Sequence, residues 1–575
     1  MNKFTLLSKI KTQVMKIETK MHKISVLLTF TLLTMVSCQT PVNEAQTNFI
    51  KTTVNGIEIN VSSKAQAQKF DHFWSVCVGA GRANEGLRAN WLEQLKLVHD
   101  SCGFQYLRFH GLFHDDMFVY REENGKPVYN WQYIDELFDR MLQTGVRPFV
   151  ELGFFPAAMS PKPTCFWWGG HGTPPADFDK WKMLVENFIK HCQARYGKEE
   201  THKWYFEVWN EPNLGGFWNG TQKQYFELYK TTVTAIKAID TVLQVGGPAT
   251  SSYHPDEAVY NRLKSKKEIT AEDFIGVECK GPWIEDFLNF CGKEKLPVDF
   301  VSSHPYPTSY PIDNEGNGLE ISRPVNCTYT DIQWLRKTIA NSKFPHAQIH
   351  LTEWSSSPSP RDHTHDYLQA ATYIAKVNLD CIGLANSLSY WTFTDVFEEG
   401  GAGDSIFHGG FGLINFQGIV KPAFHAYHML NQLGDVSILR TKMGILTRNS
   451  STGKLSGLFY NYPDEVIAAA PISKGSCDVA EKTLATGKNR TLSLVIRDLK
   501  PNAHFTVEIL DKNHGFALGE WRKMGSPDPP TREQTQLLKK LAMNIQKEQI
   551  RSDEKGMLNL ELTLSPWAVV LLKED

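Results

Sequence analysis

The feature that most restricts the fold of this chain is an alternation that repeats eight times between residues 70 and about 430. Each repeat pairs a short apolar run with a longer stretch whose apolar positions recur every three or four residues, as in helices. Three of these stretches, 90–103, 131–145 and 178–197, end in glycine, a helix stop. Eight strand–helix repeats predict an α/β fold, a (β/α)8 TIM barrel. The predicted strands are Phe73–Val78, Tyr106–His110, Pro148–Leu152, Trp204–Trp209, Val242–Gly246, Phe300–His304, Ile349–Glu353 and Leu388–Phe393.

The barrel is expected to occupy residues 70–433, with its last helix over Pro422–Leu433. A chain of 575 residues has room for it, because one such barrel takes about 250 to over 400 residues. A doubly wound sheet is the alternative. The chain has neither the G-x-G-x-x-G motif nor the phosphate-binding loop that would support it.

After about residue 434 the alternation stops, and short strand-like segments separated by turn residues follow. They predict a β-sandwich accessory domain over 434–575. A helix over 531–549 interrupts it and begins with a capping box, Thr531 and Gln534. Residues 39–69 form an N-terminal segment, whose strand-like part Asn48–Val61 is expected to join the sandwich. The predicted strand segments of the sandwich are 455–462, 491–499, 504–511 and 558–572.

The segment 1–38 predicts a lipoprotein-type signal peptide. Lys20 and Lys23 precede the apolar run Ile24–Val36, which is too short to span a membrane, and Ser37 and Cys38 follow. Acylation would make Cys38 the new N-terminus, anchoring a protein exported to the periplasm or the outer membrane. A simple secretory signal is the alternative, and translation starts at either Met1 or Met21. The remainder has no comparable apolar stretch and is expected to be soluble.

Composition excludes several classes of function. With 61 Lys+Arg and 63 Asp+Glu the formal charge is −2, so no general electrostatic attraction to nucleic acid exists. Contact with a membrane is expected only through a lipid on Cys38. Apart from Cys38, nine scattered cysteines form no C-x-x-C pair, which argues against a zinc ribbon or a thioredoxin-like site. Since H-E-x-x-H and calcium-loop motifs are also absent from the sequence, no metal and no cofactor is expected.

Two glutamates stand where predicted strands end, which is where barrels carry their active sites. Glu211 lies between Asn210 and Pro212, and Glu353 precedes Trp354. A lone glutamate at a strand end is more often a structural carboxylate that caps a loop. A pair facing each other across a barrel mouth suits glycoside hydrolysis, with the carboxyls about 5–5.5 Å apart in retaining enzymes and about 6.5–9.5 Å in inverting ones.

The motifs around these glutamates give a specific resemblance. Asn-Glu-Pro (210–212) and Thr-Glu-Trp (352–354) look like the paired motifs of clan A retaining glycosidases. More narrowly, the mature chain resembles glycoside hydrolase family 39, which comprises β-xylosidases and, more distantly, α-L-iduronidase. Further matching segments are YLRFHGLFHDD (106–116), DFVSSHPYP (299–307), YWTFTDVFEE (390–399) and MGSP (524–527).

The resemblance implies a role for each matching residue. Glu211 is expected to be the general acid/base and Glu353 the nucleophile. Asn210 would bind the sugar 2-hydroxyl, Trp391 would form a floor under the ring, and Tyr306 would orient Glu353. The remaining substrate-binding residues are expected to be His110, His304, Glu398 and Glu399.

Each of these secondary roles has a structural alternative. His110 and His304 could be satisfied core histidines, Trp391 a core aromatic, and Glu398 and Glu399 a solvated loop. Trp167 and Trp168, in the long loop after the third predicted strand, suit either stacking on a leaving sugar or a hydrophobic lid.

The resemblance favours a retaining exo-glycosidase that releases β-linked xylose from xylo-oligosaccharides or xylosides. β-Glucosidase, α-L-arabinosidase and α-L-iduronidase remain alternatives, and so does a non-catalytic surface glycan-binding lipoprotein. Residues 395–404 carry four carboxylates, and no Arg or Lys occurs between 377 and 420. We therefore expect repulsion of an anionic sugar and a preference for a neutral one. Besides the sugar substrate, self-association into an oligomer is left open.

Overall fold

The computed structural model describes residues 48–309, 321–470 and 475–575. The chain divides after Phe49, and the second unit, Ile50–Asp575, is compact. The predicted signal peptide and Cys38 lie outside the described residues. Over the described ranges, no helix combines the length and the apolar content needed to cross a bilayer.

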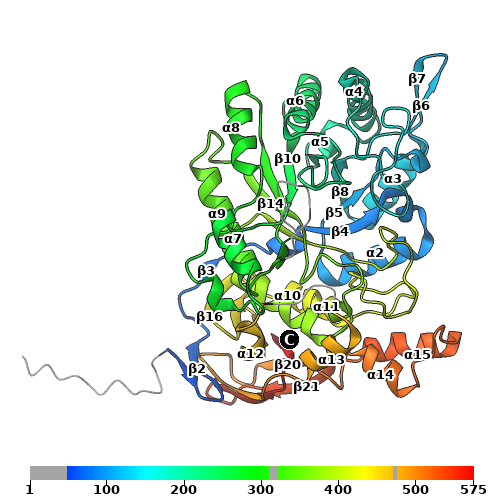
Figure 1. The fold of residues 1–575 in the computed structure, drawn as a ribbon. Helices are drawn as coiled ribbons and strands as arrows, with labels where there is room; N and C mark the ends of the chain where they lie inside the picture. Colours follow the sequence, from blue (N-terminus) through cyan, green and yellow to red (C-terminus); the bar gives the residue numbers. More distant parts are fainter. Residues whose placement is uncertain (1–47, 310–320, 471–474) are drawn as a thin grey trace, which may run out of the picture. The chain divides into compact units, whose positions relative to one another are not determined.

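Eight parallel strands close into a barrel within the second unit (Figure 1). This confirms the predicted (β/α)8 fold, and every predicted strand overlaps an observed one. The first predicted strand is shifted, because Phe73–Ser75 is a 3₁₀ turn and the strand starts at Cys77. Phe73 and Trp74 are fully buried, so this apolar run marks burial rather than a strand. In ring order the strands are β4 (Cys77–Arg82), β5 (Tyr106–His110), β8 (Arg147–Leu152), β9 (Tyr205–Val208), β10 (Gln244–Ser251), β11 (Phe300–His304), β14 (Gln348–Trp354) and β15 (Ser387–Tyr390).

Helices surround the barrel, and three of them end at the predicted glycines. Gly103, Gly145 and Gly197 follow α2, α3 and α4 with φ of 79°, 95° and 82°, a backbone region in which only glycine is unstrained. The larger barrel helices are α2 (Ala89–Cys102), α3 (Gln132–Thr144), α4 (Phe178–Tyr196), α6 (Gln222–Ile239), α8 (Ile284–Glu294), α9 (Cys327–Ala340), α10 (Leu368–Asp380) and α11 (Pro422–Asn431).

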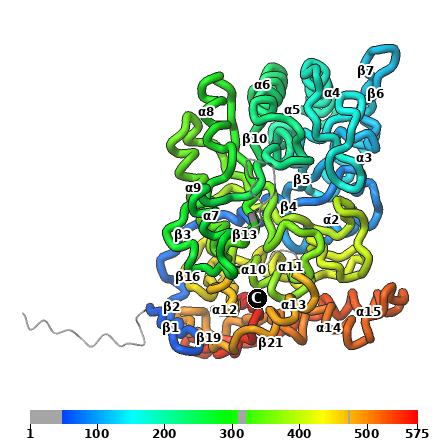
Figure 2. The backbone as a smooth tube through the Cα atoms, in the orientation of Figure 1, coloured from blue at the N-terminus to red at the C-terminus, as the bar shows by residue number. Residues whose placement is uncertain are grey.

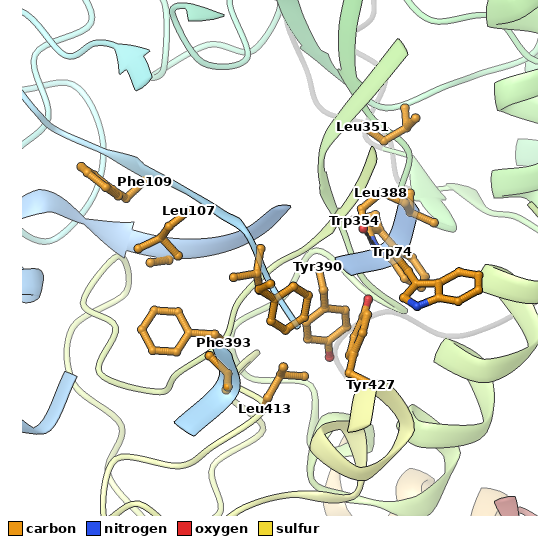
Figure 3. Packing of buried hydrophobic residues seen from close by; sticks show 14 of the residues in the cluster. Trp74, Leu107, Phe109, Leu351, Trp354, Leu388, Tyr390, Phe393, Leu413 and Tyr427 are labelled. Carbon is orange, nitrogen blue, oxygen red and sulfur yellow. Dashed lines mark hydrogen bonds between the residues drawn. The ribbon is translucent and has the colours of Figure 1, made fainter. Parts of the chain in front are cut away.

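Aromatic side chains pack at the junction between β15 and β4, the last and first strands of the barrel (Figure 3). Tyr390 of β15 pairs in register with Val78 of β4. Its ring lies 5.9 Å from Trp354 on β14 and 5.6 Å from Tyr427 on α11, centroid to centroid. All three aromatic side chains are buried. This packing holds β14, the strand that ends in Glu353 and Trp354, against the barrel core.

Two sheets face each other in the C-terminal part and confirm the predicted sandwich. One has the order β1-β2-β19-β22, and the other β21-β20-β23-β18-β17-β16-β3. The N-terminal strand β2 joins this sandwich, as the sequence predicted, and lies beside β19 (Figure 2), with which it pairs in parallel. Buried apolar side chains from both sheets, including Leu494 and Val570, fill the space between them. The strands are β1 (Phe49–Thr53), β2 (Gly56–Ser62), β3 (Gln68–Lys69), β16 (Val436–Thr441), β17 (Gly444–Arg448), β18 (Leu455–Tyr460), β19 (Arg490–Arg497), β20 (His504–Leu510), β21 (Gln546–Arg551), β22 (Leu558–Leu564) and β23 (Val569–Glu574).

The helix predicted over 531–549 is shorter in the structure. It begins with the predicted capping box at Thr531 but ends at Ala542, as α15 (Arg532–Ala542). Residues Gln546–Arg551 instead form the edge strand β21 against β20. Their polar, helix-compatible composition gave no sign of this, because pairing with a neighbouring strand overrode local propensity.

Helix α10 ties the barrel to the sandwich. The Thr372 hydroxyl donates to the Trp567 carbonyl oxygen over 2.8 Å, and the Gln369 side-chain amide donates to Ala480 O over 2.9 Å. Helix α10 also contacts strands β17, β18 and β23 of the larger sheet. Helix α10 thus links the sandwich to the part of the barrel that follows β14, the strand that carries Glu353.

A fully buried lysine anchors the long loop between β15 and α11. Lys421 Nζ lies 2.7 Å from Asp366 Oδ1 and 2.6 Å from Asp395 Oδ2, and none of the three side chains is more than 1% exposed. Replacing Lys421 by methionine keeps the volume but leaves two buried carboxylates unpaired. We expect a loss of about 3–5 kcal/mol of unfolding free energy, measured by urea denaturation.

Lys96→Met is the matched control for this prediction. Lys96 pairs with Asp100 over 2.7 Å as well, but their side chains are 66% and 52% exposed. Exposed pairs contribute little, so the control should leave the midpoint nearly unchanged. Equal shifts in the two variants would show that burial does not control the contribution of Lys421.

Candidate active site

The backbone turns sharply where β9 ends. Trp209 and Glu211 adopt left-handed φ angles of 74° and 45°, which are rare for residues other than glycine. Glu211 also precedes Pro212, and its N–H donates to Ala249 O over 2.9 Å, which fixes the turn. Strain of this kind concentrates at functional sites, where it holds a side chain in a set direction.

The two glutamates singled out by the sequence lie close together. The side chain of Glu353, near the end of β14, approaches that of Glu211 in this turn. Their side chains are only 8% and 7% exposed. One carboxylate oxygen from each lies within 4.8 Å of the other, with a ring nitrogen of His304 at the same spacing. The separation is close to that of retaining glycosidases and well below that of inverting ones.

Residues at the end of β11 and in the loop after it bind each carboxylate. His304 Nδ1 lies 2.8 Å from Glu211 Oε1, and the Tyr306 hydroxyl donates to Glu353 Oε2 over 3.1 Å. The Tyr306 contact has the geometry that the resemblance implied. His304 Nδ1, Glu211 Oε1 and Glu353 Oε2 thus all have partners within the protein.

Arg108 is the central residue that the sequence analysis missed. It is fully buried on β5, and its Nη1 contacts Glu353 Oε1 over 2.6 Å. Its Nε contacts Glu207 Oε2 over 2.6 Å, and its Nη2 lies 2.9 Å from Glu151 Oε2. Nη2 also donates to Asn210 Oδ1 over 2.8 Å, which leaves the Asn210 amide hydrogens to donate elsewhere. The guanidinium thus orients the glutamate and the asparagine together.

A usable signal for these missed residues exists in the sequence. Arg108, Glu151 and Glu207 are charged residues inside otherwise apolar strands, a placement that requires a buried partner. Arg108 and His110 stand at alternate positions of one strand, which places both side chains on the same face of β5.

His110 lies beside the same cluster. Its Nδ1 is 2.6 Å from Glu151 Oε2, and its Nε2 is 3.3 Å from Glu399 Oε1 and 3.6 Å from Glu353 Oε1. Burial acts to lower its pKa, but these carboxylates outweigh it and raise the pKa to about 10. His110 is therefore an imidazolium at neutral pH, and is not a neutral core histidine.

Aromatic rings close the site on one side. The Trp391 ring centroid lies 4.8 Å from that of His110 and 5.7 Å from Arg108 Cζ. Gly79 makes room for this ring, because a Cβ there would lie 2.3 Å from a Trp391 ring carbon. The Phe166 ring stacks on that of His110, with centroids 5.4 Å apart. Trp167 is 72% exposed, and its backbone N–H donates to the backbone carbonyl oxygen of Glu399.

Glu398 is not brought to the carboxylate pair. Its two oxygens lie 2.7 Å from the guanidinium groups of Arg82 and Arg88. Asp395 is likewise neutralised by Lys421. These cations lie outside residues 377–420 in the sequence, and barrel closure brings β4 beside β15. The expected repulsion of an anionic sugar is therefore wrong for Asp395 and Glu398, whose charges are already compensated.

The environments of the two glutamates differ. Burial raises the pKa of Glu211 to about 7, against a hydrogen bond from Ser251 and the charges of His110 and Arg108. Burial also raises the pKa of Glu353, while His304 and Arg108 act in the opposite direction. With Arg108 and Tyr306 bound directly to it, Glu353 is the better stabilised carboxylate. Glu211 is suited to carry a proton near neutral pH.

Comparison with known proteins identifies the family of the chain. The model of the family "Glycosyl hydrolases family 39" matches residues 57–559. A beta-xylosidase of Geobacillus stearothermophilus is 36% identical, with 90% of this chain and 95% of that protein covered. One of Caldicellulosiruptor saccharolyticus is 34% identical, with 89% and 97% covered. The crystal structure of a monomeric beta-xylosidase from Caulobacter crescentus CB15 superposes with a TM-score of 0.75 at 33% identity, covering 89% of this chain and 98% of that one.

Proposed function

The chain belongs to glycosyl hydrolases family 39 and is a glycosidase, and from this premise we propose that it releases β-linked xylose from the ends of xylo-oligosaccharides or xylosides with retention of configuration. The observation that carries the mechanism is the approach of one oxygen of Glu211 to within 4.8 Å of one oxygen of Glu353. This spacing leaves no room for the water that an inverting enzyme places between sugar and base.

In the proposed first step, a Glu353 oxygen attacks the anomeric carbon and the glycosidic C–O bond breaks. Glu211 gives its proton to the departing oxygen. In the second step, Glu211 takes a proton from water as the water oxygen attacks the same carbon, and Glu353 leaves as a carboxylate. Arg108 and Tyr306 support this role, because each binds one oxygen of the nucleophile and keeps it directed.

Support for xylose comes from the beta-xylosidases that this chain resembles over nine-tenths of its length. The aromatic rings of Trp391 and Phe166, which lie beside His110, suit packing against the face of a pyranose ring. β-Glucoside, α-L-arabinoside and α-L-iduronide activity are the alternatives within the same mechanism.

Initial rates on nitrophenyl β-xyloside, β-glucoside, α-L-arabinoside and α-L-iduronide test the choice of sugar. We expect the xyloside to give the highest kcat/KM. Proton NMR of methyl β-xyloside hydrolysis should show β-xylose before mutarotation. Early α-xylose from this substrate would contradict retention, and a preference for the iduronide would reject a neutral substrate.

The pH dependence of kcat/KM is expected to be bell-shaped, with its basic limb near pH 7. Glu211 must be protonated to act as the acid, so activity is lost as the pH rises through its pKa of about 7. Glu353 must be ionised, so activity is also lost as the pH falls through its pKa, which burial raises. Rates on methyl β-xyloside between pH 4 and pH 9 measure both limbs. A basic limb two or more units above 7 would assign it to another group.

We also propose that the protein is exported and anchored by a lipid on Cys38. The apolar run Ile24–Val36 followed by Ser37 and Cys38 supports this. Labelled palmitate should be incorporated into the wild-type protein in bacteria and not into Cys38→Ala. Incorporation into both would reject the anchor.

A further inference from the structure

We propose that Thr352 and Glu207 fix the tautomer of His304 and thereby keep Glu211 protonated in the free enzyme. This inference rests on the proposed role of Glu211 as the general acid. Neither residue touches the substrate in this scheme, so both are positioning residues. Thr352 directly precedes Glu353 on β14, and Glu207 lies on β9, the strand that leads into Glu211.

The four side chains form a continuous buried chain. The Thr352 hydroxyl donates to Glu207 Oε1 over 2.8 Å. Thr352 Oγ1 also lies 3.1 Å from His304 Nε2, and His304 Nδ1 lies 2.8 Å from Glu211 Oε1. Thr352, Glu207 and His304 are 0% exposed and Glu211 is 6% exposed, so no surface group competes for these bonds.

The direction of each bond follows from the number of protons available. Glu207 is ion-paired with Arg108 over 2.6 Å, so its other oxygen accepts rather than donates. The single Thr352 proton is therefore used on Glu207, and towards His304 the Thr352 oxygen accepts. The ring proton must then lie on Nε2. Nδ1 is left with a lone pair, and its contact of 2.8 Å with Glu211 requires the proton to be on the carboxyl oxygen.

His304 has only one ring proton to place. Burial lowers the pKa of His304 to about 4, so the ring is neutral at working pH. Glu353 Oε2 lies 3.6 Å from Nδ1, too far for a hydrogen bond that would hold the proton there. The other tautomer would need Thr352 to abandon a charged acceptor at 2.8 Å for a neutral one at 3.1 Å.

The charges around Glu211 favour the same state. The groups facing it or His304 are Ser251 on β10, Arg108 and His110 on β5, Glu151 on β8, Glu207 on β9, Tyr306 after β11, Glu353 on β14 and Glu399 after β15. Among these described groups, the carboxylates Glu151, Glu207, Glu353 and Glu399 face two cations, Arg108 and His110. Ionising Glu211 adds another buried negative charge. It also places a carboxylate oxygen next to the lone pair of His304 Nδ1, which repels it.

The relay would serve both proposed steps. When Glu211 gives its proton to the departing oxygen, its carboxylate is left facing a nitrogen that offers no hydrogen. This raises the free energy of the ionised form, so Glu211 is a stronger base when it takes the proton from water in the second step. The His304 ring proton stays on Nε2 throughout.

Thr352→Val tests the relay through the pH profile. It keeps the shape of the side chain but removes the hydroxyl, so Nε2–H loses its acceptor and the ring proton can move to Nδ1. A donor at Nδ1 stabilises ionised Glu211. The basic limb of kcat/KM on methyl β-xyloside should then shift down by about one pH unit or more, as expected for one hydrogen bond to a charged group. Thr352→Ser keeps the hydroxyl and should restore the wild-type limb.

Thr232→Val is the matched control. Thr232 is equally buried, on α6, and its hydroxyl accepts from Trp181 Nε1 over 2.8 Å. This variant should lose thermal stability without moving the pH profile. A basic limb that stays at its wild-type position in Thr352→Val, with only kcat or stability reduced, would overturn the proposal.

Neutron diffraction of the wild-type protein gives a second test that needs no variant to fold. Deuterium on His304 Nε2 and on Glu211 is expected. Deuterium on Nδ1 would overturn the proposal even in a fully active, retaining xylosidase. Failure of the proposed function would instead be seen as a Glu211→Ala variant that keeps full activity on substrates with poor leaving groups.

Discussion

Replacing Glu353 by alanine is expected to lower kcat/KM on nitrophenyl β-xyloside by about 10⁴-fold or more, because the group that forms the covalent intermediate is gone. The fold should survive, because Arg108 keeps Glu207 and Glu151 as buried partners. Circular dichroism and thermal unfolding check that survival. Glu561→Ala, on an exposed position of β22, is the control and should keep the wild-type rate.

Added azide distinguishes a lost nucleophile from a damaged site. The space left by Glu353→Ala lies on the face of the sugar opposite the leaving group. Azide entering there should restore turnover and give the α-xylosyl azide. Full activity without azide would reject Glu353 as nucleophile, and a β-xylosyl azide would place the missing group on the other face.

Replacing Glu211 by alanine should produce losses that depend on the leaving group. Methyl β-xyloside and xylobiose need protonation of the departing oxygen, and general acid catalysis contributes about 10²–10⁴-fold. Dinitrophenyl β-xyloside needs none, so its first step should be nearly unaffected. Values of kcat/KM across a series of aryl xylosides, which report the first step, measure this as a steeper dependence on the leaving-group pKa.

Azide again provides the internal control for Glu211→Ala. With Glu353 intact, the xylosyl-enzyme forms, and azide attacking it should give the β-xylosyl azide. Equal losses on methyl and dinitrophenyl xylosides would show that Glu211 acts in binding and not as an acid. The opposite anomers expected from the two variants assign the two carboxylates independently.

Most of the barrel and both central carboxylates could be predicted from the sequence. Periodicity marks strands and helices, and barrel chemistry occurs at strand ends, so Glu211 and Glu353 could be found without coordinates. The first strand and the end of the 531–549 helix were misplaced. The first error arises because Phe73 and Trp74 are buried without forming a strand, and the second because β21 pairs with β20. Both depend on tertiary contacts, which the local sequence pattern does not indicate.

The partners of the carboxylates could not be predicted in the same way. Arg82 and Arg88 reach Glu398 from the opposite end of the barrel sequence, so a count of charges along 377–420 gave the wrong balance. Arg108 was inside a quoted motif, yet its position at the centre of the site depends on three other strands, β8, β9 and β14, which bring their glutamates to it.

The sequence by itself determined the fold class, the family resemblance and which two acids stand at the strand ends, because these depend on residue type and spacing along the chain. Only the tertiary structure decided which partners surround each carboxyl: Arg108 and Tyr306 bind Glu353, whereas burial raises the pKa of Glu211 to about 7. Protonation depends on burial and on charges a few ångströms away in space, and barrel closure brings those charges together from strands far apart in the chain.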